Sequence, residues 1–277
     1  MTSFLQAENV SYVYSDGTVA LQNVSSSFDC GESVAVIGRN GSGKTTLAKV
    51  LAGMFRPTSG RVLVEETNYV GYTVAELGRK IGYVFQNFDY QLFSDTVENE
   101  VSFGLRNMGL PETEIQSRVS ETLQSLSIEQ YRNTHPRRLS SGERQAVAIA
   151  SILAMQPNAV ILDEPTTGQD QARTTEITNF IQRLTREGKL VIVVSHNIGH
   201  VATCCQRIVV VHDGKIVADG PTSEILANKQ LLQQIHVKPT PMMQLSELLQ
   251  QHGCPTTAFS IQDMAGFIKT QTRRNQT

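Results

Sequence analysis

Hydrophobic residues in this chain gather in short runs of four or five side chains, mostly β-branched or aliphatic, which polar or glycine-rich segments separate. Runs of this kind are typical of strands that are buried on both faces of a sheet. They occur at residues 34–37, 81–85, 159–162, 190–194 and 208–211. Between them the apolar positions often recur every three or four residues, as in an amphipathic helix. The alternation predicts an α/β fold with a largely parallel sheet.

Two segments depart from this alternation. Residues 4–29 alternate apolar and polar positions around a glycine-containing turn, which predicts antiparallel strands that lead into the first buried run. From about residue 97 to residue 155 the pattern is helical, with Pro111 at the start of one helix and Ser141 near the start of another. We therefore expect an α/β domain at 1–220 that carries an antiparallel β lead-in and an α-helical insert.

The last part of the chain has a different pattern. After Pro221 no strand-like run occurs, and the apolar residues fit two or three short helices, the last preceded by Ser260 and Asp263 as a capping box. We expect residues 221–277 to form a small helical C-terminal domain that serves in dimerisation and ends in a frayed polar tail from Thr270. A ligand-sensing role is the weaker alternative, because this segment is short and lacks strands.

Composition narrows the choice of partners. A net charge of -2 and a pI near 6.3 give no electrostatic footprint for nucleic acid. The longest apolar runs are far shorter than the roughly 20 residues that span a bilayer, so we expect a membrane role only through a partner. The first residues contain neither a basic stretch nor a long apolar one, and the four cysteines show no C-x-x-C spacing. Both features favour a cytosolic chain with reduced thiols.

A glycine-rich segment directly after the first buried run carries the strongest chemical signal. It matches G-x-x-x-x-G-K-[ST] at every fixed position, between a predicted strand and a predicted helix. Its glycines allow backbone N–H groups to point at a phosphate chain, and the helix N-terminus favours the anion. Lys44 can add a charge between the β- and γ-phosphates, and the Thr45 hydroxyl can bind Mg²⁺. The binding residues predicted here are Gly38, Arg39, Asn40, Gly41, Ser42, Gly43, Lys44, Thr45 and Thr46.

Two carboxylates, Asp163 and Glu164, follow the apolar run at 159–162. Open α/β sheets bind ligands at the carboxyl ends of their strands, so this position favours a role in the same site. Successive side chains of an extended segment point to opposite faces, which predicts that the two carboxylates do not bind one ion side by side. We expect one of them to hold the metal while the other faces the attacking water.

Tyr14 lies just before the turn predicted between the first two strands. An aromatic ring at this place could stack on a purine base. Periodicity alone favours another interpretation, in which the tyrosine lies at the rim of the sheet and packs on its neighbours.

The order of several motifs carries a family resemblance. The segment 139–145, Leu-Ser-Ser-Gly-Glu-Arg-Gln, precedes the acidic strand end, while Gln86 lies before this segment and His196 follows the acids. Together with the glycine-rich loop, this arrangement over residues 1–220 resembles the nucleotide-binding domain of ABC ATPases, which has a P-loop NTPase core. The resemblance implies an ATPase that binds ATP and Mg²⁺ and works as a dimer, with two ATP molecules at the interface.

The same resemblance assigns roles to single residues. It implies that the Tyr14 ring stacks on adenine, which reverses the preference from periodicity. It also implies that Asp163 holds Mg²⁺ through water and that Glu164 polarises the attacking water. The other implied positions are Thr45 and Gln86 at the metal, Gln86 as the sensor of the water, His196 as the switch at the γ-phosphate, Ser140 and Gly142 as contacts to the ATP of the opposite subunit, and Asp170 in the loop that couples the two sites.

Two departures from the family pattern concern the signature segment and the loop after the acids. Ser141 stands in place of the first glycine of LSGGQ, and Glu143 stands in place of its glutamine. A serine and a carboxylate near a phosphate predict a weaker contact with the opposite ATP. Gln169 stands where leucine is common. Neither departure removes a catalytic group.

Within this family, residues 87–104 are similar to energy-coupling factor (ECF) ATPases, although Phe88 stands where proline is usual. The segment 239–267 is similar to their short C-terminal helical domain. This resemblance implies an importer subunit at the cytoplasmic face of the membrane, for a vitamin or a transition-metal ion. The implied partners are a second ABC ATPase subunit (a copy or a paralogue), a transmembrane coupling protein and a substrate-binding membrane protein, and no nucleic acid. A soluble ABC ATPase of the cluster-assembly or remodelling type is the alternative.

Carboxylates are frequent in the segment after Gln86, at Asp89, Asp95, Glu98 and Glu100. Composition alone favours a solvated acidic face. Because this segment of ABC ATPases lines the groove for a helix of the membrane subunit, we expect Glu98 and Glu100 to take part in docking.

Overall fold

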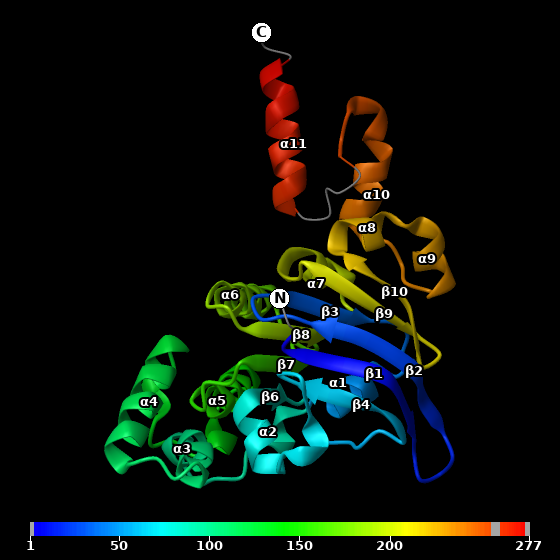
Figure 1. The fold of residues 1–277 in the computed structure, drawn as a ribbon. Coiled ribbons are helices and arrows are strands. Elements are labelled where there is room, and N and C mark those ends of the chain that lie inside the picture. Colours follow the sequence, from blue (N-terminus) through cyan, green and yellow to red (C-terminus); the bar gives the residue numbers. More distant parts are fainter. Residues whose placement is uncertain (1–2, 256–260, 275–277) are drawn as a thin grey trace.

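A six-stranded sheet forms the centre of the fold (Figure 1), and the computed structural model describes residues 3–255 and 261–274 of the chain. In spatial order the strands are β10 (Lys215–Pro221), β9 (Arg207–His212), β3 (Ser33–Ile37), β8 (Leu190–Val194), β7 (Ala159–Asp163) and β6 (Ile81–Val84). All pairs are parallel except β10 with β9 at one edge. The α/β class and the largely parallel sheet predicted from the sequence are therefore confirmed.

A second, antiparallel sheet packs over one face of the parallel sheet. In spatial order it consists of β2 (Val19–Phe28), β1 (Leu5–Val13), β4 (Ser59–Val64) and β5 (Thr67–Asn68). The helix α1 (Lys44–Leu51) contacts both sheets, and its Leu47 belongs to the buried cluster that joins them. The predicted antiparallel lead-in is confirmed by the pairing of β1 with β2.

Helices cover the opposite face of the parallel sheet. They are α6 (Gln171–Arg186), α7 (Ile198–Cys204), α8 (Thr222–Ala227) and α9 (Lys229–Gln234). The apolar side chains of α8 and α9 belong to the same buried cluster as those of α6 and α7, so this part of the C-terminal segment packs on the main core.

The α-helical insert lies beside the sheets and has a buried cluster of its own (Figure 1). It consists of α3 (Val97–Asn107), α4 (Glu112–Ser125) and α5 (Ser141–Leu153), and the short helix α2 (Val74–Lys80) precedes β6. Pro111 occupies the N-cap of α4. Ile149 of α5 joins the cluster on the helical face of the parallel sheet, so α5 connects the insert to the core.

Two further helices lie at the C-terminal end, α10 (Pro241–Leu248) and α11 (Ile261–Arg274). They stand away from the sheets (Figure 1) and share a small apolar cluster. The frayed tail predicted from Thr270 is wrong, because α11 continues to Arg274 and the Thr270 hydroxyl donates to the Gly266 carbonyl. The predicted capping residue Ser260 lies outside the described residues. The dimerisation role of 221–277 stays a prediction.

No helix in the described part of the chain has both the length and the apolar character needed to span a membrane.

The carboxylates that were expected to dock a membrane subunit are engaged inside the insert. Glu100 is only 3% exposed, and its Oε2 atom accepts the backbone N–H groups of Phe93 and Ser94 at 2.9 and 2.7 Å. Glu98 forms an ion pair of 3.0 Å with Arg132. The burial of Glu100 contradicts its expected role in docking, whereas docking through Glu98, whose side chain is 24% exposed, stays a prediction. Glu100 lies three residues from the buried Val97 on α3, so helical geometry turns it inward.

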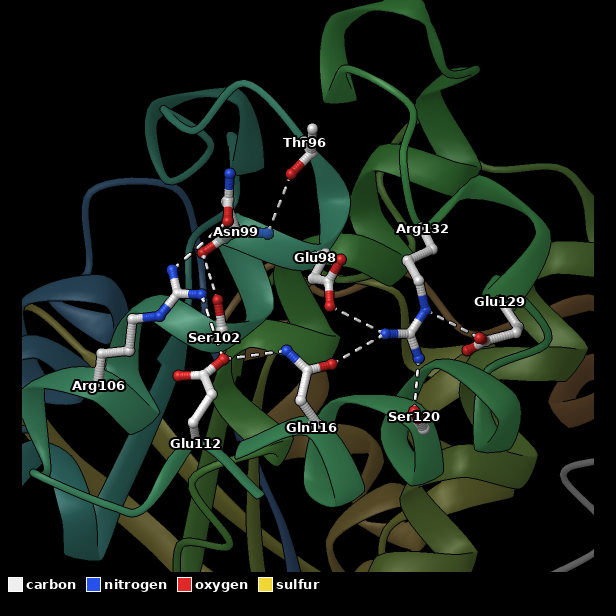
Figure 2. Close-up of polar contacts among 10 residues, drawn as sticks. All are labelled: Thr96, Glu98, Asn99, Ser102, Arg106, Glu112, Gln116, Ser120, Glu129 and Arg132. Atoms are coloured by element: carbon white, nitrogen blue, oxygen red, sulfur yellow. Dashed lines mark hydrogen bonds and ion pairs between the residues drawn. The ribbon is translucent and has the colours of Figure 1, made fainter. Parts of the chain in front are cut away.

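Figure 2 shows Arg132 at the centre of a polar network that joins α3, α4 and a short 3-10 turn. Its guanidinium donates to the carboxylates of Glu98 and Glu129 and to the hydroxyl of Ser120. The planar fork of arginine suits several acceptors at once. The network therefore fixes the first turn of α3 against α4.

We expect Glu100→Ala to lower the free energy of unfolding by about 2 to 4 kcal/mol, because it leaves two backbone N–H groups without an acceptor. Glu98→Ala is the matched control. It removes one partly exposed ion pair and should cost less than about 1 kcal/mol. Urea denaturation of both variants measures the difference. Equal losses for the two variants would contradict the role of Glu100.

Candidate active site

The predicted site residues meet at one edge of the parallel sheet. The glycine-rich loop follows β3, Asp163 ends β7, and His196 comes two residues after the end of β8. These strands are neighbours in the order β3-β8-β7-β6, and their carboxyl ends point the same way. Gln86 follows β6 and is exposed at the same edge. This is the place where open parallel sheets bind ligands.

The glycine-rich loop has a backbone that only glycine can adopt at two positions. Gly38 has a φ of 152°, and a Cβ atom there would lie 2.1 Å from the Val211 carbonyl oxygen. Gly43 has a φ of 106°, and a Cβ atom would lie 2.5 Å from the Ala20 carbonyl oxygen. The loop is therefore held tightly on its inner side. Its outer residues Arg39, Asn40 and Gly41 are exposed.

Lys44 is buried, and its ammonium group is satisfied by the loop itself. The Nζ atom donates to the carbonyl oxygens of Gly38 at 3.0 Å and Arg39 at 2.9 Å. Burial lowers the pKa of Lys44, and the nearby carboxylates of Glu164 and Asp163 oppose that shift. The cation is thus held against the backbone of the loop. Phosphate oxygens can replace the two carbonyls as its acceptors.

Asp163 is buried at the end of β7 with both carboxylate oxygens engaged. The Thr45 hydroxyl donates to Oδ1 at 3.2 Å, and the Tyr83 hydroxyl donates to Oδ2 at 2.9 Å. Burial raises the pKa of Asp163, and the two hydrogen bonds oppose that shift. Tyr83 was not among the predicted site residues. It lies on β6, and only the pairing of β6 with β7 brings it to Asp163.

The oxygen atoms of Thr45 and Asp163 fit a magnesium site. A hydroxyl and a carboxylate that approach within 3.2 Å are the hard ligands that Mg²⁺ uses. Within the described residues no group of three or more His, Cys, Asp or Glu side chains could hold a metal by itself. Such a sparse protein set is typical of Mg²⁺ that is bound mainly by water and substrate phosphates.

The backbone conformation of Glu164 differs from the extended one expected from the sequence. The strand ends at Asp163, and Glu164 has a φ of 50°, so the premise of an extended segment is wrong. Its N–H still donates to the Val194 carbonyl at 2.8 Å. The left-handed turn places the two carboxylates against different partners. Their separate roles thus stay predictions, now on a different geometric basis.

His196 and Glu164 form a direct pair. The His196 Nδ1 atom lies 2.7 Å from Glu164 Oε1, and the Thr167 hydroxyl donates to Oε2 at 3.2 Å. Glu164 is 9% exposed, whereas the side chain of His196 is 58% exposed. The imidazole therefore orients a buried carboxylate and leaves its other edge open to a ligand. Thr167 is a second site residue that the motifs did not reveal.

The surroundings of Tyr14 fit both a rim tyrosine that packs on its neighbours and a residue near the nucleotide site. Its ring packs edge-on against Tyr12 and Phe55, with centroids 5.1 and 6.1 Å away, as a rim tyrosine would. Its hydroxyl lies 2.9 Å from the hydroxyl of Thr46 in α1, next to the phosphate loop. The residue is therefore near the site, and stacking on adenine stays a prediction.

The signature residues form a second group at the N-terminus of α5. Ser140 caps the helix, and its N–H and hydroxyl both donate to Glu143 Oε2 at 2.7 Å. Hydrogen bonds from Tyr131 and Ser140 lower the pKa of Glu143. Gly142 lies in the first turn of α5, and Asp170 caps α6. Both donors of Ser140 are thus held by a carboxylate that replaces the usual glutamine.

This chain is similar to known ABC transporter ATP-binding proteins. A family model described as ABC transporter matches residues 21–167. The energy-coupling factor transporter ATP-binding protein EcfA of Methanothermobacter thermautotrophicus is 40% identical over 236 residues, which are 84% of this chain and 76% of that protein. A Methanosarcina acetivorans protein named as an ABC transporter ATP-binding protein is 39% identical over 265 residues, 95% of this chain. The chain spans only 43 to 46% of the length of that protein and two further relatives.

Solved structures of similar fold add to these relatives. CbiO1 from Clostridium perfringens, part of the ABC transporter complex CbiONQ, has a TM-score of 0.77 and 35% identity over 90% of this chain and 100% of its own. A dimeric ATP-binding cassette in a post-hydrolysis state with ADP and Pi has a TM-score of 0.71 and 30% identity. The alignment covers 79% of this chain and 98% of that cassette.

We expect Glu164→Gln to keep nucleotide binding and to lower ATP hydrolysis roughly 100-fold or more, because it removes the carboxylate that is expected to polarise the attacking water. Lys44→Ala should instead lose ATP binding, since it removes the cation held at the loop. Glu187→Gln is the control, because the carboxylate of Glu187 is exposed at the C-terminal end of α6. Phosphate release and equilibrium binding of labelled ATP separate the two effects. Hydrolysis by Glu164→Gln within a few-fold of the unmodified chain would contradict its assignment.

Proposed function

The chain belongs to the family of ABC transporter ATP-binding proteins, and on this premise we propose that it is the ATP-hydrolysing subunit of an ECF-type importer. The observation that carries the hydrolytic part is the Glu164–His196 pair beside Lys44, Thr45 and Asp163. The similarity to EcfA and to CbiO1 supports the importer type. The imported substrate is a vitamin or a transition-metal ion, which a separate membrane protein selects.

Phosphoryl transfer requires mainly positioning and charge stabilisation. Lys44 exchanges its loop carbonyls for phosphate oxygens, and backbone N–H groups of the loop hold the remaining oxygens. Thr45 and Asp163 would hold Mg²⁺, which neutralises charge on the β- and γ-phosphates when it is bound. Glu164 accepts a hydrogen bond from the attacking water and aligns it with the γ-phosphate. His196 holds Glu164 through Nδ1 and presents its exposed edge to that phosphate.

A second ATPase subunit, either a copy or a paralogue, completes the site. The N-terminus of α5 carries Ser140 and Gly142 on the outside of the insert. Backbone N–H groups at a helix N-terminus favour an anion, and the opposite subunit supplies the γ-phosphate for this position. The dimeric cassette with ADP and Pi supports this arrangement.

An exposed aromatic surface in the segment that follows Gln86 in the sequence supports docking to a transmembrane coupling protein at the cytoplasmic face. Tyr90 is 86% exposed, Phe93 64% and Phe103 48%. The rings of Phe93 and Phe103 lie edge to face with centroids 4.8 Å apart, so they form one patch. Exposed apolar patches of this kind mark interaction sites. A soluble ABC ATPase, the alternative function, has no need of such a patch.

We expect the double variant Phe93→Ser and Phe103→Ser to weaken membrane association of the assembled importer about tenfold or more, since it removes the aromatic anchors of the surface. The ATPase of the isolated subunit should stay within about twofold, because neither ring touches the nucleotide site. Val74→Ser, an exposed apolar residue on α2, is the control. Co-purification with membranes and mass-spectrometric identification of bound partners provide the measurement. Unchanged association with the membrane fraction would contradict the docking proposal.

We expect Glu143→Gln to tighten ATP-driven dimerisation several-fold, because it removes a negative charge that is held at Ser140, next to the phosphate of the opposite subunit. Sedimentation of the dimer in the Glu164→Gln background, where ATP persists, measures the effect. Glu121→Gln on α4 serves as the control. A weaker or unchanged dimer would show that the charge of Glu143 does not act on the nucleotide.

A further inference from the structure

Helix α5, which carries the signature residues, is tied to the segment after the catalytic carboxylates at two points. The buried Gln145 amide donates to the Pro165 carbonyl at 2.7 Å. Farther along, the Arg173 guanidinium donates through Nη2 to the Gly142 carbonyl at 2.5 Å. The two contacts lie on either side of the loop that contains Asp170. The position of the signature turn is thus set by the segment that follows the hydrolytic site.

Arg173 contacts both functional loops by itself. Its backbone N–H donates to Asp170 Oδ1 at 2.8 Å, and its side chain reaches Gly142 in the first turn of α5. Its other terminal nitrogen pairs with Glu176 one turn along α6. The side chain is 22% exposed, so the guanidinium is largely enclosed. These contacts fix both the direction of the guanidinium and its distance from the signature turn.

The contact between the Arg173 side chain and the Gly142 backbone depends on an arginine opposite a glycine. The planar guanidinium can bind a carboxylate and a carbonyl at the same time, whereas a lysine offers a single point charge. A Cβ atom at Gly142 would lie 3.4 Å from Arg173 Nε, so the guanidinium lies directly against the signature backbone. Tyr131 and Ser140 lower the pKa of Glu143 most, and the charge of Arg173 adds to that shift.

We propose that Arg173 is a positioning residue that holds the signature turn and Asp170 in one fixed relation, so that both reach the nucleotide of the opposite subunit together. This inference rests on the proposed function as a dimeric ATPase. Within its own subunit, Glu164 is anchored separately, by the Val194 carbonyl and by His196. Loss of Arg173 therefore impairs hydrolysis at the partner's site and spares its own.

Mixed dimers of two differently tagged copies test this direction. Glu164→Gln in one copy restricts hydrolysis to the nucleotide site of the other copy. In the trans arrangement, Arg173→Ala is placed in the copy with Glu164→Gln, whose signature turn serves the active site. In the cis arrangement, Arg173→Ala is placed in the copy that hydrolyses. We expect kcat to fall about tenfold in the trans arrangement and less than about twofold in the cis arrangement, as loss of one charge-assisted hydrogen bond predicts.

Two further variants keep the test decisive. Arg183→Ala, which removes another arginine of α6 that donates to the Ser125 carbonyl, should change neither arrangement. Arg173→Lys retains the charge without the fork, and we expect a smaller loss in the same trans direction. It replaces Arg173→Ala in the mixed dimers if thermal unfolding shows that the alanine variant does not fold.

The outcomes separate this inference from the proposed function. Equal loss in both arrangements, loss in the cis arrangement alone or no loss would overturn the positioning role while ATP hydrolysis stands. Absence of hydrolysis in dimers of the unmodified chain would overturn the proposed function, and this inference with it.

Discussion

Charge buried at the end of a parallel sheet is the constraint on which the rest of the site depends. Lys44, Asp163 and Glu164 are each less than a tenth exposed, and an unpaired buried charge is strongly destabilising. Each charge is compensated from a different strand end: Lys44 by the loop after β3, Asp163 by a tyrosine of β6, and Glu164 by the histidine after β8. The strand order therefore does more than build a core, because it brings together the partners that make these charges tolerable.

Local pattern predicted the parts of this arrangement that a short segment determines. The apolar run that ends in Asp163 is typical of a buried strand, and the loop from Gly38 to Lys44 needs glycines wherever the backbone has a positive φ. The helical pattern that starts near Ser141 likewise predicts the start of α5, which begins at Ser141. These features depend on neighbours along the chain, which is why local pattern was enough to infer the fold class, the phosphate loop and the two carboxylates. The roles of the other candidate residues were inferred from the family resemblance.

Contacts across elements were not predictable in this way. Tyr83 meets Asp163 only because β6 pairs with β7 in one register, and no spacing in the sequence reveals that register. Glu100 looks like a surface acid by composition, yet its position on the buried face of α3 makes it an acceptor for backbone N–H groups. Arg173 is separated from Gly142 by 31 positions. In each case the missing information is the packing of two distant segments.

The carbonyl groups that hold Lys44 act as an internal substitute for a ligand. When a molecule binds in the loop, its own acceptors replace these two carbonyls. The gain in free energy is then only the difference in hydrogen-bond strength between the two sets of acceptors. Charged phosphate oxygens are the stronger acceptors for an ammonium group, so the exchange favours a polyphosphate. A nucleoside without phosphates has no charged acceptor that could replace the hydrogen bonds between Lys44 and the two loop carbonyls. Selection against unphosphorylated metabolites is therefore a property of the loop itself, independent of any contact with the base.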